Sequence, residues 1–498
     1  MIEGLKPYAE YKESGQQWLG RLPSHWDLRR MKLLLREVDA RSTTGKEQLL
    51  RVSQYTGVTQ RKAADGSDAP DSRAASLVGY KRVAKNDLVI NIMLAWNGSL
   101  GASRYDGIAS PAYCVYRFNK SASPWYYHEL LRLPLYKGRI KTASTGVVES
   151  RLRLYSDDLG RIETLIPPPD EQAAIVRFLD HANRKIDGFI RAKRKLIALL
   201  GEQKQAIIHR AVTGKDEVRM MKDETGTSSF ILQPSSLPKK PSGIPWLGDI
   251  PKHWEVWRIS RFAKVGNGST PSRSNMGFWS GGTYPWLNSS HVNRGFIDSA
   301  DQFVTQTALR ACHLPKVAAG SVLIAITGQG KTRGTSAVLG IEATINQHIA
   351  YITPRVPVVT AEYLQLGLTA AYSTLRSMSD DSGSTKGALT CEDIKRFKLA
   401  VPPLEEQAQL VASISSETSA ANTAIARTER EIALMLAYRT RLTADVVTGK
   451  LDVRPAAAKL PDVLSDMPDQ SAESDQADAS GEPDLSEDQT TDTQEDAP

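Results

Sequence analysis

The chain has 498 residues, of which 41% are hydrophobic and 24% charged, the composition of a soluble globular protein with about three domains. No stretch approaches the roughly 18 consecutive apolar residues of a membrane span, and the N-terminal residues contain no apolar run that could act as an export signal. We therefore expect a cytoplasmic protein. Its three cysteines lie far apart, which argues against a disulfide framework and against a CxxC metal site.

The net charge of +7 combines two oppositely charged parts. The last 37 residues, from Asp462 onward, contain 13 acidic and no basic residues, so the rest of the chain has 63 basic and 43 acidic residues and a net charge of +20. This excess favours a polyanionic partner, with nucleic acid as the first candidate. The acidic tail has few apolar residues to bury and should be disordered. It either only solubilises the protein or mimics the charge of DNA.

Several motifs occur twice, in the same order, in the two halves of the chain. KESGQQWLGRLPSHWDLRRM at residues 12–31 returns as KPSGIPWLGDIPKHWEVWRI at residues 240–259. Two further pairs are LYSDDLGRIETLIPPPDEQ (154–172) with LTCEDIKRFKLAVPPLEEQ (389–407), and AVTGK (211–215) with VVTGK (446–450). The pattern predicts an internal duplication of a two-part unit. His25 and His253 should contact the adjacent Trp26 and Trp254 rather than act as ligands or bases.

Each predicted unit consists of a mixed, strand-rich region followed by one long helix. Short apolar runs such as DLVINIML and SVLIAIT, separated by Gly, Asn, Asp and Pro, indicate strands. The predicted fold class is α+β, with two β-rich mixed domains separated by an antiparallel coiled coil and related by a pseudo-twofold repeat. The predicted boundaries are an N-terminal segment (1–26), a first mixed domain (27–166), a long helix (167–213), a linker (214–245), a second mixed domain (246–401), a second long helix (402–448) and an acidic tail (449–498).

Both long helices carry an apolar stripe. Asp170 and Glu171 follow a Pro-rich stop and favour a helix N-terminus, and apolar residues then recur at heptad spacing. Each helix should have about 44 residues and a length of about 66 Å. Folding the second helix back along the first would bury both stripes in an antiparallel coiled coil. The predicted seam contains Ile175, Leu179, Ile186, Phe189, Leu196, Leu200, Leu410, Ile414, Ile425, Ile432, Met435 and Leu442.

The first long helix is also basic, with ten Lys or Arg and three acidic residues between Ala173 and Lys215. The face that carries Arg191, Lys193, Arg194 and Lys195 is either solvated or in contact with the phosphate backbone of DNA. Phosphate contacts would supply affinity and register without sequence information.

At these motifs the chain resembles the DNA specificity subunits of type I restriction–modification enzymes, over roughly residues 12–450. The resemblance rests on the SG..WLG.(L/I)P.HW segment, the PP..EQ segment and the TGK of each half. The second half adds GNGSTP (266–271), GGTYPW (281–286) and ATINQHI (343–349). The first half lacks the GNGSTP pattern, so its subfamily is less defined.

The resemblance implies that each mixed domain is a target-recognition domain that reads one half of a bipartite, asymmetric site on double-stranded DNA. The helices would space the two domains and dock two modification (methyltransferase) subunits, which restriction (translocase-nuclease) subunits then join in defence against foreign DNA. This chain would be the non-catalytic subunit of a multisubunit type I restriction endonuclease and adenine methyltransferase. S-adenosylmethionine, ATP and Mg²⁺ would belong to the partner subunits.

Two sequence features bear on catalysis. No Asp or Asn precedes the Pro-Pro pairs, so the (D/N)PP(Y/F) element with which an amino-methyltransferase holds its target base is absent. AITGQGKT at residues 325–332 satisfies a relaxed P-loop pattern, but a P-loop passes directly into a helix. The residues that follow, RGTSAVLGIEAT, favour a strand instead. We therefore expect a strand–turn–strand segment that places Lys331, Thr332 and Arg333 near DNA. For the whole chain we expect no catalytic and no metal-binding residues.

To recognise a DNA sequence, a protein needs side chains with paired hydrogen-bond donors and acceptors. In the first mixed domain the candidates are Gln54, Tyr55, Thr56, Lys81, Arg82, Asn97, Ser99 and Arg151. In the second they are Asn267, Ser269, Thr270, Asn288, Ser290, Lys331, Arg333, Asn346 and Gln347. For each of them, capping of a turn or strand is an equally good interpretation. An alternative for the whole chain is a coiled-coil scaffold whose globular parts bind protein, which predicts DNA binding with weak salt dependence.

Overall fold

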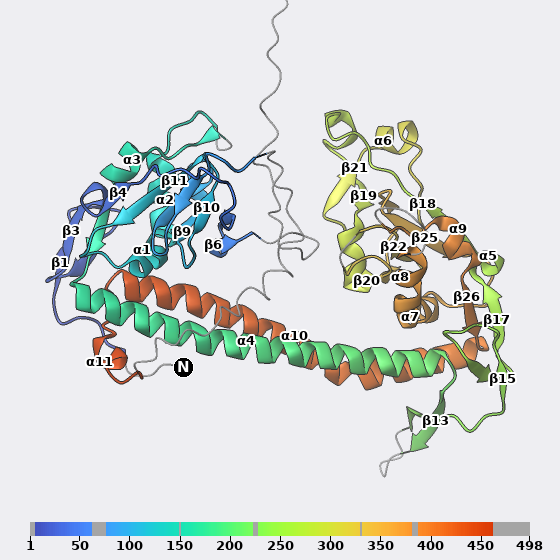
Figure 1. Cartoon of the computed structure of the whole chain (residues 1–498). Coiled ribbons are helices and arrows are strands. Elements are labelled where there is room, and N and C mark those ends of the chain that lie inside the picture. Colours follow the sequence, from blue (N-terminus) through green and yellow to red (C-terminus); the bar gives the residue numbers. More distant parts are fainter. Residues whose placement is uncertain are drawn as a thin grey trace, which may run out of the picture. The chain divides into compact units, whose positions relative to one another are not determined.

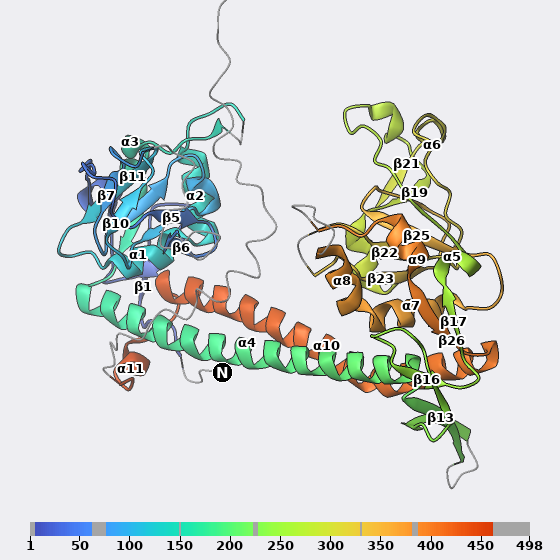
Figure 2. The ribbon, with the colours of Figure 1, turned by 45° about the vertical axis from the view of Figure 1, so that its right-hand side comes forward.

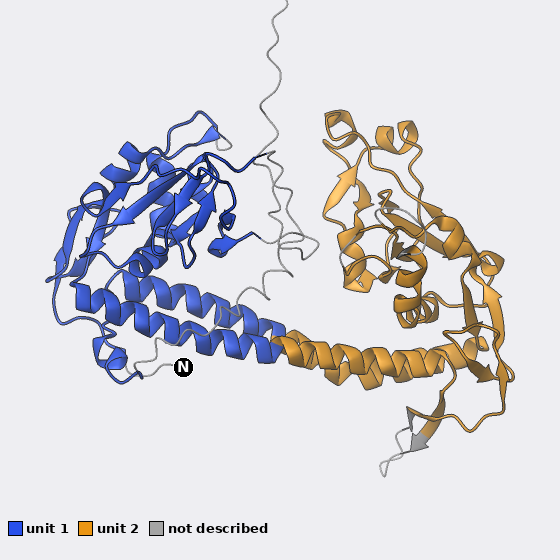
Figure 3. Ribbon diagram, viewed as in Figure 1, with its two compact units in different colours: residues 1–193, 429–465 blue, residues 194–428, 466–498 orange. Residues whose placement is uncertain are grey.

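A computed structural model describes residues 5–61, 76–148, 151–222, 228–328, 331–380 and 387–461. Of the acidic tail predicted over 449–498, residues 462–498 lie outside this range. Residues 449–461 are folded, contrary to that prediction, because Val453 and Ala457 are buried in the apolar core around the start of α4 (Pro169–Val212). The chain divides into two compact units, Met1–Lys193 with Glu429–Ser465 (unit 1) and Arg194–Thr428 with Asp466–Pro498 (unit 2), as Figure 3 shows. Both units combine helices and strands, as the α+β class predicts.

Unit 1 is built on a four-stranded antiparallel sheet in the order β4-β11-β8-β9. Figure 1 labels β4, β11 and β9 of this sheet. All four residues of β8 are buried, because neighbouring elements cover both of its faces. The strands are β1 (Tyr11–Glu13), β2 (Arg21–Pro23), β3 (Asp27–Arg30), β4 (Leu35–Glu37), β5 (Leu50–Ser53), β6 (Gly57–Gln60), β7 (Lys81–Val83), β8 (Leu88–Asn91), β9 (Leu100–Ala102), β10 (Gly107–Ala109), β11 (Tyr113–Phe118) and β12 (Glu163–Ile166). The short helices are η1 (Met31–Leu33), η2 (Ala95–Asn97), α1 (Pro124–Leu131), α2 (Pro134–Ala143), α3 (Ser156–Arg161) and α11 (Arg454–Ala457).

Unit 2 contains a five-stranded sheet in the order β18-β25-β22-β23-β20 and a three-stranded sheet in the order β21-β19-β24. Its strands are β17 (Glu255–Arg258), β18 (Ala263–Asn267), β19 (Tyr284–Leu287), β20 (Phe296–Ile297), β21 (Gln302–Val304), β22 (Val322–Ala325), β23 (Ser336–Leu339), β24 (Thr344–Ile345), β25 (Ile349–Pro354) and β26 (Lys398–Val401). Its short helices are α5 (Ile259–Phe262), η4 (Met276–Phe278), η5 (Ser289–Arg294), α6 (Gln306–Ala311), α7 (Ala361–Ala370), α8 (Tyr372–Asp380) and α9 (Cys391–Arg396).

The segment expected to be a polar linker contains strands. β13 (Asp216–Lys222) pairs with β14 (Ser228–Pro234), and β15 (Lys239–Pro241) pairs with β16 (Asp249–Pro251), both antiparallel. Val218 and Leu232 of the first hairpin pack against the core of unit 2. Val218 and Leu232 are direct partners in this hairpin, so a single cross-strand pair supplies this packing, and no run of alternating apolar residues marked the strands in the sequence.

Two helices have 44 residues, α4 (Pro169–Val212) and α10 (Leu404–Val447) (Figure 2). Both contribute to both units (Figure 3). In unit 1, Arg439 of α10 forms an ion pair with Asp187 of α4 at 2.8 Å, and Lys193 forms one with Glu431 at 2.7 Å. In unit 2, Lys204 hydrogen-bonds Asn422. Within each unit, the first half of one helix therefore lies beside the second half of the other.

The buried stripe of α4 in unit 1 follows Ile175, Leu179, Ala182, Ile186 and Ile190, each at most 5% exposed. Two predicted seam residues depart from it, because Phe189 is 38% and Leu196 41% exposed. An α-helix has 3.6 residues per turn, so a strict heptad drifts about 20° per repeat away from the packed face. The buried position therefore moves from residue 189 to residue 190. Leu410, Ile414 and Leu442 are buried in α10, whereas Leu200, Ile425, Ile432 and Met435 are partly exposed.

Candidate nucleic-acid interface

A carboxylate explains the repeated HW motif of unit 1. Trp26 is fully buried, and its Nε1 donates to Glu171 Oε1 at 3.0 Å. His25 Nε2 lies 2.8 Å from Glu171 Oε2, and the Tyr8 hydroxyl also donates to Oε1. Glu171 stands in the first turn of α4, where the helix dipole stabilises a negative charge. These contacts anchor the start of the helix to the N-terminal motif.

The same contacts occur in unit 2. Trp254 Nε1 donates to Glu406 Oε1 at 3.0 Å, and His253 Nε2 lies 2.8 Å from Glu406 Oε2. We expected the two histidines to pack against or hydrogen-bond the adjacent tryptophans. The rings of His253 and Trp254 are in edge contact, but each histidine forms its hydrogen bond with the glutamate of PP..EQ, which also accepts from the tryptophan. The sequence contained a signal for this glutamate, because the PP..EQ motif occurs in both halves of the chain, as the P.HW motif does.

The glutamine and glycine of the other repeated motifs also have structural roles. Gln172 Oε1 accepts from Ser123 N at 2.7 Å and its Nε2 donates to Pro167 O at 2.8 Å; Gln407 makes the same bonds to Thr360 N and Pro402 O. Gly449 has a φ of +76°, and a Cβ there would lie 2.6 Å from Pro23 Cδ. Gly214 has a φ of +67°, and a Cβ there would lie 2.1 Å from Pro251 Cδ. A side chain would be strained and would clash at either position.

Replacing Glu171 by Ala should destabilise unit 1 by about 3–5 kcal/mol, because it leaves the buried Trp26 N–H and Tyr8 O–H without their acceptor. The matched control is Asp170→Ala, which removes an exposed carboxylate from the same helix turn. It should cost less than about 1 kcal/mol. Urea unfolding of the full chain, followed by circular dichroism, measures both values. Equal destabilisation by the two substitutions would contradict this role for Glu171.

The first domain's candidate residues fall into two groups. Gln54, Tyr55 and Thr56 occupy the turn between β5 and β6, and Asn97 and Ser99 flank the turn between η2 and β9. The backbones of both turns accept hydrogen bonds from Arg132. The remaining candidates lie elsewhere in the unit and are Lys81, Arg82 and Arg151.

These three basic residues differ in exposure. Lys81 is only 6% exposed and pairs with Glu37 at 3.7 Å and Asp39 at 3.5 Å, so its charge is compensated within the protein. Arg82 lies 3.9 Å from Glu47 and is exposed, as is Arg151. Their contact with DNA stays a prediction.

The second domain's candidates gather around β18, η5 and the turn before β25. Thr270 Oγ1 donates to Gln347 Oε1 at 2.5 Å, which joins two candidate residues 77 positions apart. Asn346 is 5% exposed, and its Oδ1 accepts from His348 N at 3.0 Å. Asn267 is the last residue of β18, and Ser269 lies two residues after it. Lys331 lies in the turn before β23.

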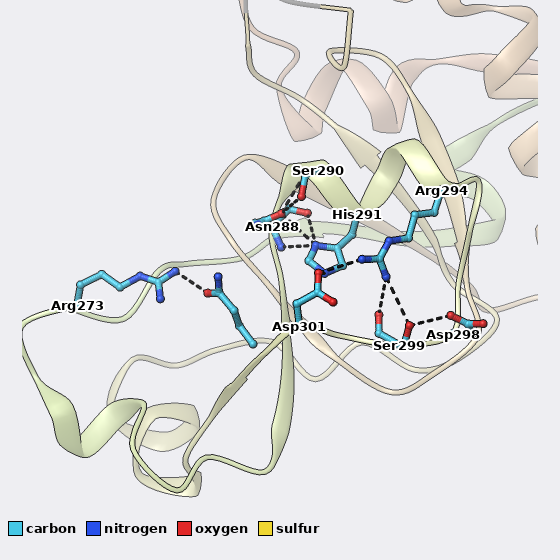
Figure 4. Close-up of polar contacts among 9 residues, drawn as sticks. Arg273, Asn288, Ser290, His291, Arg294, Asp298, Ser299 and Asp301 are labelled. Carbon is cyan, nitrogen blue, oxygen red and sulfur yellow. Dashed lines mark hydrogen bonds and ion pairs between the residues drawn. The ribbon is translucent and has the colours of Figure 1, made fainter. Parts of the chain in front are cut away.

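Asn288 and Ser290 cap η5. Asn288 Oδ1 accepts from Ser290 N at 3.0 Å and Oγ at 2.6 Å, and it lies 3.0 Å from His291 Nδ1 (Figure 4). Arg333 is 4% exposed and its Nη1 donates to Gly387 O at 2.5 Å. The polar side chains of these three residues are therefore accounted for by hydrogen bonds within the protein.

Two arginines that sequence reasoning did not select stand beside this group. Arg294 Nη2 pairs with Asp301 Oδ2 at 2.9 Å (Figure 4). Arg273 Nη2 donates to Gln302 Oε1 at 2.7 Å, and its guanidinium lies 3.9 Å from the centre of the Trp279 ring. An arginine held over an aromatic ring is pre-ordered for contact with a base or phosphate. No local pattern distinguishes these arginines from the many others in the chain.

The P-loop-like segment lies between two antiparallel strands. β22 precedes it, and β23 follows and pairs with β22 from Val322↔Val338 to Ile324↔Ser336. Residues 329–330 lie outside the described range, but the element after Thr332 is a strand. The strand–turn–strand interpretation is therefore confirmed, and the helix that a P-loop requires is not at this position.

Two general properties hold for the part of the chain that the structure describes. It has no group of three or more His, Cys, Asp or Glu side chains arranged to hold a metal ion. None of its helices is long and apolar enough to cross a membrane.

Comparison with known proteins identifies the class. Residues 251–432 match the family model of the type I restriction modification DNA specificity domain. The chain is 24% identical over 186 residues to the specificity subunit of a type I restriction enzyme of Escherichia coli. That match covers 37% of this chain and 46% of the relative, so it spans less than half of the relative's length. The specificity subunit of the type I restriction enzyme EcoKI, from Escherichia coli K12, is 21% identical over 407 residues, which are 77% of this chain and 79% of that one.

The fold has a counterpart among solved structures. A structure concerned with complex assembly and conformational transition of the type I R-M system contains a chain that matches with a TM-score of 0.55 at 16% identity. The match covers 86% of this chain and 99% of that chain. Residues 251–432 thus match a DNA specificity domain of the type I restriction–modification class. The chain as a whole is similar in sequence to type I specificity subunits, in agreement with the resemblance found in its motifs.

Proposed function

We propose that this chain directs a separate methyltransferase, and through it a translocating nuclease, to a bipartite asymmetric DNA site. Each target-recognition domain, 27–166 and 246–401, reads one half of that site. The chain itself supplies recognition and no catalysis. The observation that carries the proposal is the specificity domain matched over residues 251–432, together with a second set of the same anchoring contacts in unit 1.

The repeated contacts support an internal duplication. The HW motif of each unit bonds the glutamate that opens one long helix, and its proline packs against the glycine that closes the other. We infer that α4 and α10 form an antiparallel coiled coil that sets the spacing of the two half-sites. Modification subunits would dock on this coiled coil, and restriction subunits would join them. S-adenosylmethionine, ATP and Mg²⁺ would be bound by those partners.

The charge of the chain fits this role. Without the acidic tail the net charge is +20, and α4 carries the basic cluster Arg191, Lys193, Arg194 and Lys195. Lys193 is paired with Glu431, whereas Arg191, Arg194 and Lys195 are exposed. These three side chains would contact phosphates of DNA between the half-sites, so binding should weaken steeply as the salt concentration rises.

The test is methylome sequencing of a host that carries this chain with a modification subunit gene, beside a control that lacks only this chain. A gapped, asymmetric methylated motif that disappears in the control is the expected result. It would give both half-sites and their spacing at once. A methylated motif that persists without this chain would overturn the proposal.

A further inference from the structure

One arginine of unit 1 holds together two turns that are distant in sequence. Arg132 stands at the C-terminal end of α1 and is partly buried. The first turn, 53–56, joins β5 to β6, and the second, 97–99, joins η2 to β9. The guanidinium bonds five backbone carbonyl oxygens: Nη1 donates to Ser53 O (3.3 Å), Gly98 O (3.1 Å) and Leu100 O (2.8 Å), and Nη2 donates to Gln54 O (2.9 Å) and Tyr55 O (2.7 Å).

Only a guanidinium satisfies this arrangement. The carbonyl oxygens converge on one small volume, where their dipoles would repel one another without a cation between them. Arginine presents its donors in a rigid planar fork, whereas the ammonium of lysine is a compact charge that cannot reach both turns at once. Burial lowers the pKa of Arg132, and the neighbouring Glu129 opposes that shift.

His128, one helical turn before Arg132, fixes the strands beneath the turns. Its Nδ1 accepts from Ala102 N of β9 at 3.2 Å. Burial and the nearby Arg132 and Arg104 lower the pKa of His128 to about 3, so the ring stays neutral and able to accept this bond. A Cβ on Gly57 or Gly101 would lie 2.9 Å from the ring, so β6 and β9 pack directly against it. The two turns are thereby set in position relative to α1.

The two turns differ in exposure: Tyr55 is exposed and Gln54 and Asn97 are partly exposed, whereas Gly98 and Ser99 are buried. Tyr55 is 71% exposed, and its backbone N is held by Ser53 Oγ at 3.1 Å. Asn97 Oδ1 accepts from Ser99 N at 3.1 Å and Ser99 Oγ at 2.9 Å, which orders the second turn. An exposed ring beside amide side chains offers the stacking and hydrogen-bonding groups that distinguish bases.

We propose that Arg132 is a positioning residue for sequence reading: it joins turns 53–56 and 97–99 into one surface that reads the first half-site. The inference rests on the proposed function and adds to it the surface that is used and the group that orders it. Arg132 does not itself touch DNA in this proposal. Its replacement should therefore alter which bases are accepted, rather than the overall affinity for DNA.

The experiment compares methylomes of hosts that carry the full-length chain with its modification subunit. The variants are Arg132→Lys, Arg132→Met and Tyr55→Ala, and the matched control is Arg161→Lys, an exposed arginine of unit 1 that pairs with Asp158 on the surface. In the Arg132 variants we expect discrimination at one or two positions of one half-site to fall at least about tenfold. The other half-site should be unchanged. Tyr55→Ala should relax positions in the same half-site, and Arg161→Lys should leave the motif intact.

Each outcome bears on one proposal. If no variant, including the unmodified chain, yields a gapped motif, the proposed function fails. If the unmodified chain yields the motif and Arg132→Lys methylates that same motif, at a normal or reduced level, Arg132 is only structural and this inference is overturned. Relaxation of both half-sites would also overturn it. Thermal unfolding of each purified variant identifies loss of folding, and Arg132→Lys, which retains the charge, keeps the test informative if Arg132→Met unfolds.

Discussion

Replacing Ile186 by Asp should destabilise unit 1 by about 3–5 kcal/mol and release the modification subunits from the complex. Ile186 is 4% exposed and lies in the stripe of α4 that packs beside α10. An aspartate there loses the apolar burial and places a carboxylate in a site without a partner. Protonation of the carboxylate would limit the cost but not remove it.

The matched control is Leu434→Asp, because Leu434 lies on α10 in the same unit and is 69% exposed. It should change the free energy of unfolding by less than about 0.5 kcal/mol. Urea unfolding gives the stability of each variant, and a pull-down with the modification subunit gives assembly. If Ile186→Asp assembles as well as Leu434→Asp does, these helices do not form the docking element.

Exchanging residues 27–166 for the same region of another specificity subunit should change one half-site completely and leave the other as it was. The two ends of this region lie side by side, because β3 at its start pairs with β12 at its end in an antiparallel arrangement. Asp27 is the partner of Ile166. The ends of the second region are paired in the same way, because Glu255 of β17 is the partner of Val401 of β26. Each region therefore begins and ends at one place on its unit, which permits replacement without moving the helices.

The reciprocal control exchanges residues 255–401, which should alter only the other half-site. In the exchange of residues 27–166, the donor should retain a tyrosine at the position of Tyr126, because its hydroxyl donates to Val447 O at the end of α10. Methylome sequencing reports both half-sites in each chimera. A change in both halves after a single exchange would contradict independent reading by the two domains.

Local signals in the sequence determined where the long helices begin and end. The helix predicted over 167–213 runs from Pro169 to Val212, and the one predicted over 402–448 runs from Leu404 to Val447. Proline residues end the strand before each long helix, and acidic residues stabilise the first turn of the helix. Glycine adopts the positive φ that ends the helix. These effects act within a few residues, so they can be recognised without knowledge of the fold.

The tertiary structure decided which side chains meet. Glu171 reaches Trp26 across 145 residues, and Arg132 reaches Tyr55 across 77. Such bonds have no period and depend on how strands and helices pack, so composition and spacing could not reveal Arg132 or Arg273. The exposure of Phe189 has the same origin, because the helical repeat of 3.6 residues and the position of the partner helix decide which apolar residues are buried. The sequence alone thus determined the helices, their ends and the repeated motifs, whereas long-range packing determined the surface that could read DNA.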